Sequence, residues 1–166
     1  MSTRDKPTQP VRNAHPPAFV MKAVNPITRA LALSRFGRRF ASLTVLQFDG
    51  RKTQKRYVIP VMAHELDDAL VVFTDARWAE NLRGGVAIQV RRGGRTVAAS
   101  ARIADTQESA SALRTVLAKL NNPQRLGLRI DEGHIPTDTE LINARTVIFI
   151  SSDDDPPTES RPVVPN

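Results

Sequence analysis

The chain has 166 residues, 40% of them apolar and 25% charged, which fits one globular domain rather than two independent hydrophobic cores. Cysteine is absent, and this excludes disulfides, thiolate metal sites and cysteine nucleophiles. The 24 Lys and Arg outnumber the 17 Asp and Glu, and the net charge of +7 favours an anionic partner: a nucleic acid, an acidic membrane surface or a phosphorylated small molecule.

The sequence shows no signal for export or membrane insertion. No apolar run approaches the ~18–20 residues that a membrane-spanning helix needs. Residues 1–17 are polar and proline-rich, and they lack the apolar stretch of a secretory signal. We therefore expect a cytoplasmic protein, and peripheral membrane attachment and a transit segment stay open as alternatives.

Proline marks the two ends of the chain. Five of the 12 prolines lie within residues 1–26 and four within 156–165, and such clusters oppose regular structure. We expect a disordered proline-rich tail over residues 1–18, a single folded domain over 19–151, and a disordered acidic and proline-rich tail over 152–166.

The first predicted element is a helix that begins at Asn25-Pro26, because Asn caps helices and Pro tolerates the first helical position. Apolar residues from Ile27 to Phe40 give it a loose apolar face, and its other positions are rich in arginine. Two interpretations stay open. The helix packs on a sheet with its arginines extended toward water, or it touches anionic lipid or covers a bound anion.

Short runs with β propensity follow, separated by turn signals such as Asp49-Gly50 and Gly93-Gly94. Pro60 marks an edge position or a bulge in one of them. The leucine and valine spacing from Leu113 to Leu120 predicts a helix capped by Asp105 or Thr106, and a shorter helix is expected over 138–144. The predicted strands cover residues 43–48, 57–62, 70–74, 86–90, 96–103 and 146–150. The predicted class is α+β, built on a mostly antiparallel barrel.

The turn between the first two strands carries the densest cluster of charge. Its cations are Arg51, Lys52, Lys55 and Arg56, and Thr53 adds a hydroxyl. Cations beside a hydroxyl and free backbone donors suit a phosphate or a polycarboxylate. The alternative is a hairpin tip whose cations only contact water.

The second signal is the segment Trp78-Ala79-Glu80-Asn81-Leu82, which holds the only tryptophan and follows the strand that ends at Thr74. An aromatic face beside an amide is suited to stack on and orient a planar ligand. The alternative is a tryptophan that serves the hydrophobic core.

Together the two segments resemble the deazaflavin-dependent nitroreductases. Gly50-Arg51-Lys52-Thr53, with Pro60 ten residues after the glycine, is similar to the Gly-Arg-(Lys/Arg)-(Ser/Thr)-Gly…Pro segment of that family. The Trp78-x-x-Asn81-Leu82 segment is similar to its Trp-x-x-Asn-Leu segment. The resemblance implies a split β-barrel of the FMN-binding type, with an N-terminal helix, one or two helices before the last strand, and a reduced deazaflavin coenzyme of the F-420 type as cofactor.

The resemblance also implies roles for individual residues. Arg51, Lys52 and Thr53 would hold the coenzyme phosphate, and Lys55 or Arg56 its acidic tail. Backbone groups of Pro60, Val61 and Met62 would meet the polar edge of the ring. The set of cofactor-binding residues is completed by Thr74, Trp78 and Asn81, and the last two would orient the ring.

Two positions depart from the family pattern. Gln54 replaces the glycine that follows the Ser or Thr, which suggests a less open phosphate turn. Tyr57 stands where family members often have arginine, and no other tyrosine is present to line a pocket near the C-terminus. We therefore do not expect nitroimidazole reduction.

The implied reaction is hydride transfer from the reduced coenzyme to an electron-poor C=C, C=N or nitro group of a small organic acceptor. Tyr57 and His64 are candidates for the proton donor, since both lie on or just after the strand beside the ring site. FMN is the alternative cofactor. The sequence leaves open the acceptor, the proton donor, catalytic competence, and whether the chain is a monomer or a homodimer.

The same sequence also allows nucleic acid or a membrane surface as a partner. Residues 1–60 carry 12 basic and 2 acidic side chains, which suits a module that binds nucleic acid or a membrane surface. Aromatic residues make up only 5% of the chain and form no stacking ladder, which argues against nucleic acid. The three histidines, His15, His64 and His134, lack metal-ligand spacing, so no metal site is expected.

Overall fold

The structure is a computed structural model that describes residues 11–13, 43–120 and 122–152. The helix predicted to begin at Asn25 lies outside these ranges, as do most residues of the two predicted tails. One short strand, β1 (Val11–Asn13), falls within the segment expected to be a disordered tail, and it pairs antiparallel with β7 (Leu128–Ile130). Val11 is only 6% exposed, so burial of an apolar side chain helps to offset the cost of ordering this segment.

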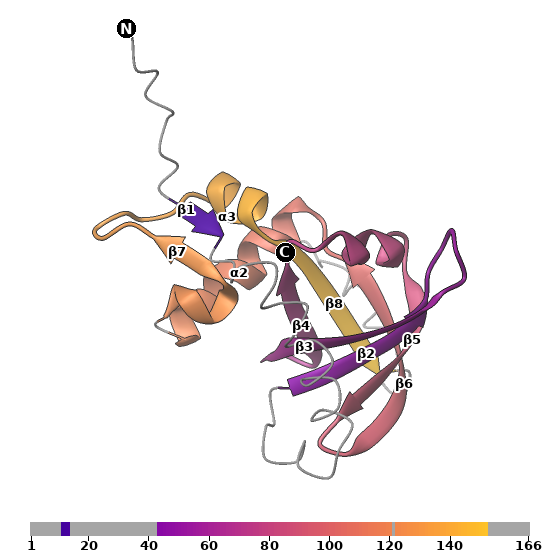
Figure 1. Cartoon of the computed structure of the whole chain (residues 1–166). Coiled ribbons are helices and arrows are strands. Elements are labelled where there is room, and N and C mark those ends of the chain that lie inside the picture. Colours follow the sequence, from indigo (N-terminus) through magenta and orange to yellow (C-terminus); the bar gives the residue numbers. More distant parts are fainter. Residues whose placement is uncertain (1–10, 14–42, 121, 153–166) are drawn as a thin grey trace, which may run out of the picture.

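Six strands close into a barrel in the order β2-β3-β4-β8-β6-β5, and every neighbouring pair is antiparallel (Figure 1). The predicted class, an α+β fold on an antiparallel split β-barrel, is confirmed, and each predicted strand lies within one observed strand. The strands are β2 (Leu43–Asp49), β3 (Arg56–Leu66), β4 (Ala69–Thr74), β5 (Val86–Arg92), β6 (Arg95–Ile103) and β8 (Thr146–Ser152).

Alternate residues along each strand fill the barrel interior, as the two-residue period of a strand requires. Along β2, Leu46 and Phe48 are buried in this core. A short 3₁₀-helix, η2 (Arg77–Leu82), adds Ala79 and Leu82 to the same core. The other buried members are Ala63, Val72, Ile88, Val90, Ala99, Ala101, Ile148 and Ile150.

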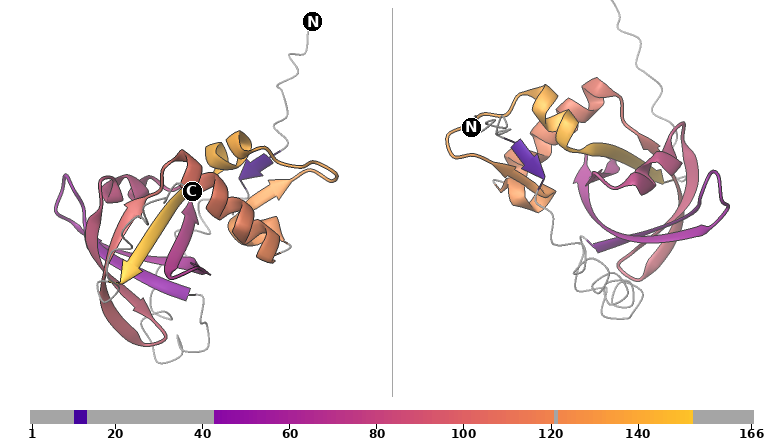
Figure 2. Two further views of the ribbon diagram at one scale, coloured as in Figure 1. Left: turned by 180° about the vertical axis from the view of Figure 1, so that it is seen from behind. Right: turned by 45° about the horizontal axis from the view of Figure 1, so that its top comes forward.

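A second core lies outside the barrel, where a helical layer packs on the outward faces of β4 and β8 (Figure 2). The layer consists of α2 (Thr106–Leu120), the 3₁₀-helix η3 (Pro123–Leu126), β7 and α3 (Asp138–Ala144), with β1 beside β7. Its buried residues include Leu113 of α2 and Leu141 of α3, packed with Val71 of β4 and Val147 of β8. In the part of the chain that the structure describes, no helix is long and apolar enough to cross a membrane.

Both helices begin at side-chain caps. Asp105 accepts a hydrogen bond from the backbone N–H of Glu108 at 2.8 Å, and the Glu108 carboxylate accepts from the Asp105 N–H at 3.0 Å. Thr137 and Glu140 form the same reciprocal pair at the start of α3. The two helices predicted after the fifth barrel strand and the predicted cap at Asp105 are therefore confirmed.

The barrel is split where β3 changes partner. Residues 56–62 of β3 pair with β2, but pairing with β4 begins only at Ala63 opposite Val72. On that second side, no strand among the described residues pairs with 56–62. Pro60 lies in this half-open stretch, as expected for a residue without a backbone N–H. The chain that leaves β4 at this opening continues into η2.

Candidate functional site

The cationic turn is a hairpin with a four-residue loop, residues 51–54. The Gly50 N–H donates to the Lys55 carbonyl and the Gln54 N–H donates to the Gly50 carbonyl, both at 2.9 Å. Gln54 has a φ of 53°, in the left-handed region that favours glycine. Gln54, which replaces the glycine of the family pattern, therefore adopts a conformation that glycine adopts without strain.

Gly50 itself is held under an aromatic ring. It is buried, and a Cβ atom added there would lie 2.7 Å from Cε2 of Tyr57 and 3.3 Å from Oγ1 of Thr53. Only glycine allows the Tyr57 ring to lie this close to the backbone. The start of the cationic loop is thereby fixed against the aromatic side chains of the barrel.

Hydrogen bonds join this hairpin to η2. The backbone N–H of Arg51 donates to Asn81 Oδ1 at 3.2 Å, and Asn81 Nδ2 donates to the Trp78 carbonyl at 2.9 Å. The Arg51 guanidinium donates to the Arg83 carbonyl at 3.3 Å. Two segments about 30 residues apart in sequence therefore meet at one end of the barrel, where the sequence predicted that an anion site and an aromatic site serve one ligand.

Three aromatic rings line this end of the barrel. Phe48 stacks on Tyr57 with a centroid distance of 5.3 Å and an interplanar angle of 6°, and it lies 6.0 Å from the Trp78 ring. Trp78 is half-buried and packs against the barrel core, so it serves the core and still presents part of its surface. Phe48 was not among the predicted site residues. It could have been found from its place at the end of a predicted strand, next to the Asp49-Gly50 turn.

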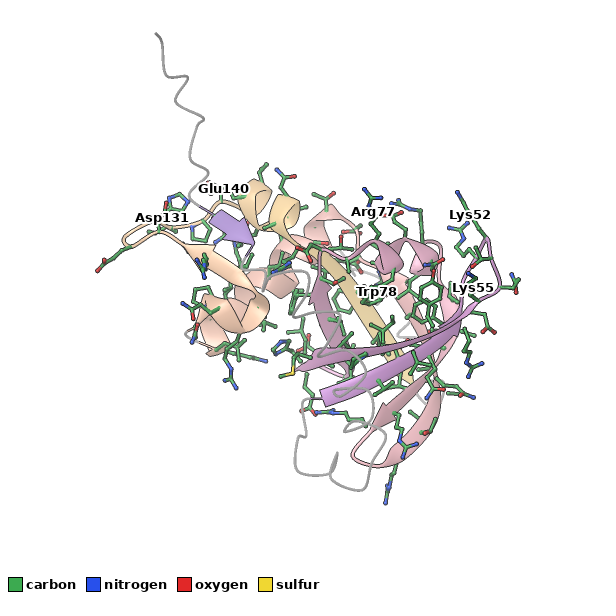
Figure 3. All side chains as sticks on the ribbon, viewed as in Figure 1. Lys52, Lys55, Arg77, Trp78, Asp131 and Glu140 are labelled. Atoms are coloured by element: carbon green, nitrogen blue, oxygen red, sulfur yellow. The ribbon has the colours of Figure 1, made fainter. Side chains whose placement is uncertain are left out.

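The cations of the hairpin divide into two groups. Lys52 and Lys55 are exposed on the hairpin beside the end of the barrel that holds Trp78, with Arg77 near the same end (Figure 3). Arg56 instead points away from the barrel interior. Its guanidinium lies 3.8 Å from Asp49 Oδ1, and it donates to the side-chain oxygens of two glutamines of β2 and β5, Gln47 at 3.4 Å and Gln89 at 3.2 Å.

The backbone register shows which groups of β3 face the opening. Gly50 and Lys55 are a hydrogen-bonded pair, so the alternation of antiparallel pairs directs the backbone groups of Tyr57, Ile59 and Val61 toward β2. The N–H and C=O of Val58 and the C=O of Pro60 therefore face the open side. Of the groups named from the sequence, the Pro60 carbonyl thus faces the open side, as do the backbone groups of Val58, whereas the backbone of Val61 faces β2.

The remaining predicted residues lie around this edge. Thr74 Oγ1 accepts from the Ala76 N–H at 3.1 Å and so turns the chain from β4 toward η2. Met62 is 48% exposed on the outward side of β3. His64 packs its ring 5.6 Å from Phe73, a residue of the outer core, and the structure does not bring it to Trp78.

The surroundings of His64 also affect its protonation. Burial lowers its pKa below the usual value, and the positive charge of Arg125 lowers the pKa further. The imidazole is therefore neutral near pH 7. Of the two proton-donor candidates, Tyr57 is the one whose ring lies at the aromatic end of the barrel.

Comparison with known proteins gives likenesses of fold. No protein-family model and no curated protein matches the chain. A solved structure described as a domain-swapped dimer is 13% identical over 66% of this chain and 80% of that chain, with a TM-score of 0.46. An F420-H2 dependent reductase is 12% identical over 66% of this chain and 92% of that chain, with a TM-score of 0.42. The FAD and heme binding protein from Mycobacterium smegmatis is 15% identical over 73% of this chain and 65% of that chain, with a TM-score of 0.46.

These likenesses concern the course of the chain alone. The roles of individual residues depend on the contacts described above, because no relative is similar enough to carry them over.

Proposed function

We propose that this protein is an oxidoreductase that binds a reduced deazaflavin coenzyme at the junction of the β2–β3 hairpin and η2. The observation that supports this most directly is the hydrogen bond from the Arg51 N–H to Asn81 Oδ1, since it joins the cationic loop to the tryptophan segment. A ligand with an anionic chain and a planar ring has matching partners on the two sides of this junction.

The anionic part of the ligand would lie on the hairpin. Arg51, Lys52 and Lys55 supply positive charge, and Thr53 adds a hydroxyl at the tip. Among the described residues, no carboxylate forms an ion pair with these three cations, so their charge is free for a phosphate and an acidic tail. Arg56, on the outer face, would contribute through the long-range field rather than by contact.

The planar part would lie between the edge of β3 and η2. The N–H and C=O of Val58 and the C=O of Pro60 offer the donor and acceptor groups of an unpaired strand edge. A ring that carries alternating C=O and N–H groups along one side, as a deazaflavin does, pairs with such an edge. Trp78 and Phe48 would hold the ring from the apolar side.

The bound coenzyme supplies the hydride. The protein's part is to orient the acceptor, to exclude water with the aromatic side chains, and to provide a proton. Tyr57 has its ring at this end, and its phenolic O–H is a hydrogen-bond donor. We therefore assign Tyr57 the role of proton donor to an electron-poor C=C, C=N or nitro group of a small acceptor.

The test is a titration of tryptophan fluorescence with the F-420 type coenzyme, and with FMN in parallel, because Trp78 is the only tryptophan. We expect saturable quenching by the deazaflavin, with an affinity at least about tenfold lower in an Arg51→Ala, Lys52→Ala double variant. The matched control is Arg95→Ala, Lys119→Ala, which removes the same charge from exposed positions on β6 and α2.

Each outcome decides between named alternatives. Equal losses in the double variant and its control would mean that net charge, not the hairpin, attracts the coenzyme. Tighter binding of FMN would assign FMN as the cofactor. Absence of quenching by either compound would overturn the proposed function.

A further inference from the structure

The chain leaves the barrel at Asp75, at the point where the split opens. The β3–β4 register places Ala63 opposite Val72, and its continuation would place Asp75 opposite Pro60 and Arg77 opposite Val58. Instead β4 ends at Thr74, which still pairs with Thr146 of β8, and the chain turns into η2. The position of Asp75 therefore decides whether the edge of β3 is open.

Arg145 forms an ion pair with Asp75. It follows α3 directly, its side chain is buried, and its Nη1 atom lies 2.8 Å from Asp75 Oδ2. The same guanidinium donates from Nε to the Leu126 carbonyl at 2.8 Å and from Nη2 to the Gly127 carbonyl. A side chain at position 127 would collide with this guanidinium. The contacts of Arg145 thus connect the helical layer to the first residue after β4.

We propose that Arg145 is a positioning residue for the candidate site: by fixing Asp75 beside β8, it keeps the strand edge of β3 open and places Trp78 and Asn81 over the end of the barrel. A guanidinium fits this task because its donors have a fixed planar arrangement that binds a carboxylate and two carbonyls at once. A buried cation also requires its partner, since a buried charge without one is strongly unfavourable.

The segment between β4 and β5 is therefore fixed at two points. Arg145 holds its first residue, Asp75, and the hydrogen bond from Arg51 holds Asn81 near its other end. The second contact depends on the hairpin that the ligand would occupy, whereas the first does not. Loss of the Arg145–Asp75 pair should loosen η2 even when the hairpin is intact.

The test uses Asp75→Ala and the milder Asp75→Asn, both in the full chain, because Asp75 is less buried than Arg145. The readout is acrylamide quenching of Trp78, measured well below each variant's midpoint of thermal unfolding. We expect the quenching constant to rise at least about twofold in Asp75→Ala, with a smaller rise in Asp75→Asn. Arg145→Lys keeps the charge but loses the planar set of donors, and it should show a rise of the same kind.

The control separates positioning from stability. Leu141→Ala removes a fully buried side chain of the same helical layer and should lower the unfolding midpoint by at least as much as Asp75→Asn. It should leave the Trp78 quenching constant unchanged. Equal quenching constants in the wild type and both Asp75 variants, or equal rises in Leu141→Ala and Asp75→Asn, would overturn the assignment of Arg145.

The proposal depends on the proposed function only where it concerns a ligand. In a second measurement, we expect the affinity for the deazaflavin coenzyme to fall about tenfold in Asp75→Ala. If the wild-type protein binds no deazaflavin but the quenching constants change as described, the proposed function fails and the role of Arg145 stands. If the coenzyme binds with equal affinity to all variants and quenching is unchanged, the role of Arg145 fails and the proposed function stands.

Discussion

The helical layer and the cationic hairpin use charge in opposite ways. Where the layer meets the barrel and within the layer, three arginines have carboxylate partners: Arg102 of β6 pairs with Glu108 of α2, Arg114 pairs with Asp138, and Arg145 pairs with Asp75. At the hairpin, Lys52 and Lys55 have no such partner within the ranges that the structure describes.

The comparison separates charges that stabilise the fold from charges that remain for a ligand. At the boundary of the layer, the guanidinium of Arg102 on β6 donates to both carboxylate oxygens of Glu108 and also lies 5.2 Å from the centroid of the Phe149 ring. At the hairpin the backbone is fixed, through Gly50 and Asn81, whereas the cationic side chains are exposed. A positioned backbone with unpaired cations is the arrangement expected of a binding site.

The largest expected effect on stability comes from a substitution in the outer core, in the helical layer. Leu113→Ala should lower the free energy of unfolding by about 2–5 kcal/mol, because Leu113 is fully buried in the helical layer. Urea denaturation measures this loss. The deazaflavin affinity of the folded variant should stay unchanged, and an affinity loss as large as that of Asp75→Ala would show that packing of the outer core, and not the Arg145–Asp75 pair alone, positions the site.

Gly50→Ala tests the hairpin side. The added methyl group meets the Tyr57 ring at 2.7 Å, so we expect destabilisation of about 1–3 kcal/mol in urea denaturation together with weaker coenzyme binding. In a double-mutant cycle with Tyr57→Ala, the two losses should be less than additive, because removal of the ring removes the collision. Strict additivity would show that the ring does not lie on Gly50.

A smaller effect is expected from the charge pair of the layer. Hydrogen bonding to Arg102 lowers the pKa of Glu108 to about 2. Because the folded-state pKa is lowered, the stabilisation is complete above the unfolded value of about 4.5 and is lost as the pH falls from there toward 2. Both side chains are partly exposed, so Glu108→Gln should cost about 1 kcal/mol at pH 6.

The control for this prediction is the pH dependence itself. The difference in urea midpoint between the wild type and Glu108→Gln should shrink between pH 6 and pH 3. A difference that stays constant over this interval would show that the ion pair with Arg102 is not its source.

The smallest expected effect is a stabilisation rather than a loss of stability. Gln54→Gly should stabilise the protein by about 0.5–1 kcal/mol, because glycine adopts a φ of 53° without strain. Gln54→Ala is the matched control, since alanine shortens the side chain but keeps the Cβ atom. If the two variants have equal urea midpoints, strain at this residue is not the reason for any change.

The strands and helices were predictable because local patterns determine them. Runs with β propensity between turn signals indicated each barrel strand, and the spacing around Leu113 indicated α2. The candidate site was predictable only in part. The motifs around Arg51 and Trp78 are local, and the structure brings them together through Asn81.

The remaining site features depend on contacts between distant parts of the chain. The opening toward Val58 follows from where β4 stops pairing with β3, and no local pattern near Val58 reveals that. Arg145 and Asp75 are about 70 residues apart in sequence, so their ion pair is visible only in the structure, where β8 lies beside β4. The outward direction of His64 likewise follows from the register of β3 and not from its distance to Pro60 in sequence.

Pro60 has a further consequence for the protein in a concentrated solution. A half-open strand edge is a template on which another extended chain can add, which is a common start of aggregation. Pro60 interrupts that template because it lacks an amide hydrogen, and the charged side chain of Arg56 stands at the end of the same edge. The edge therefore resists a second polypeptide, while the backbone groups of Val58 and the Pro60 carbonyl remain for the proposed ring.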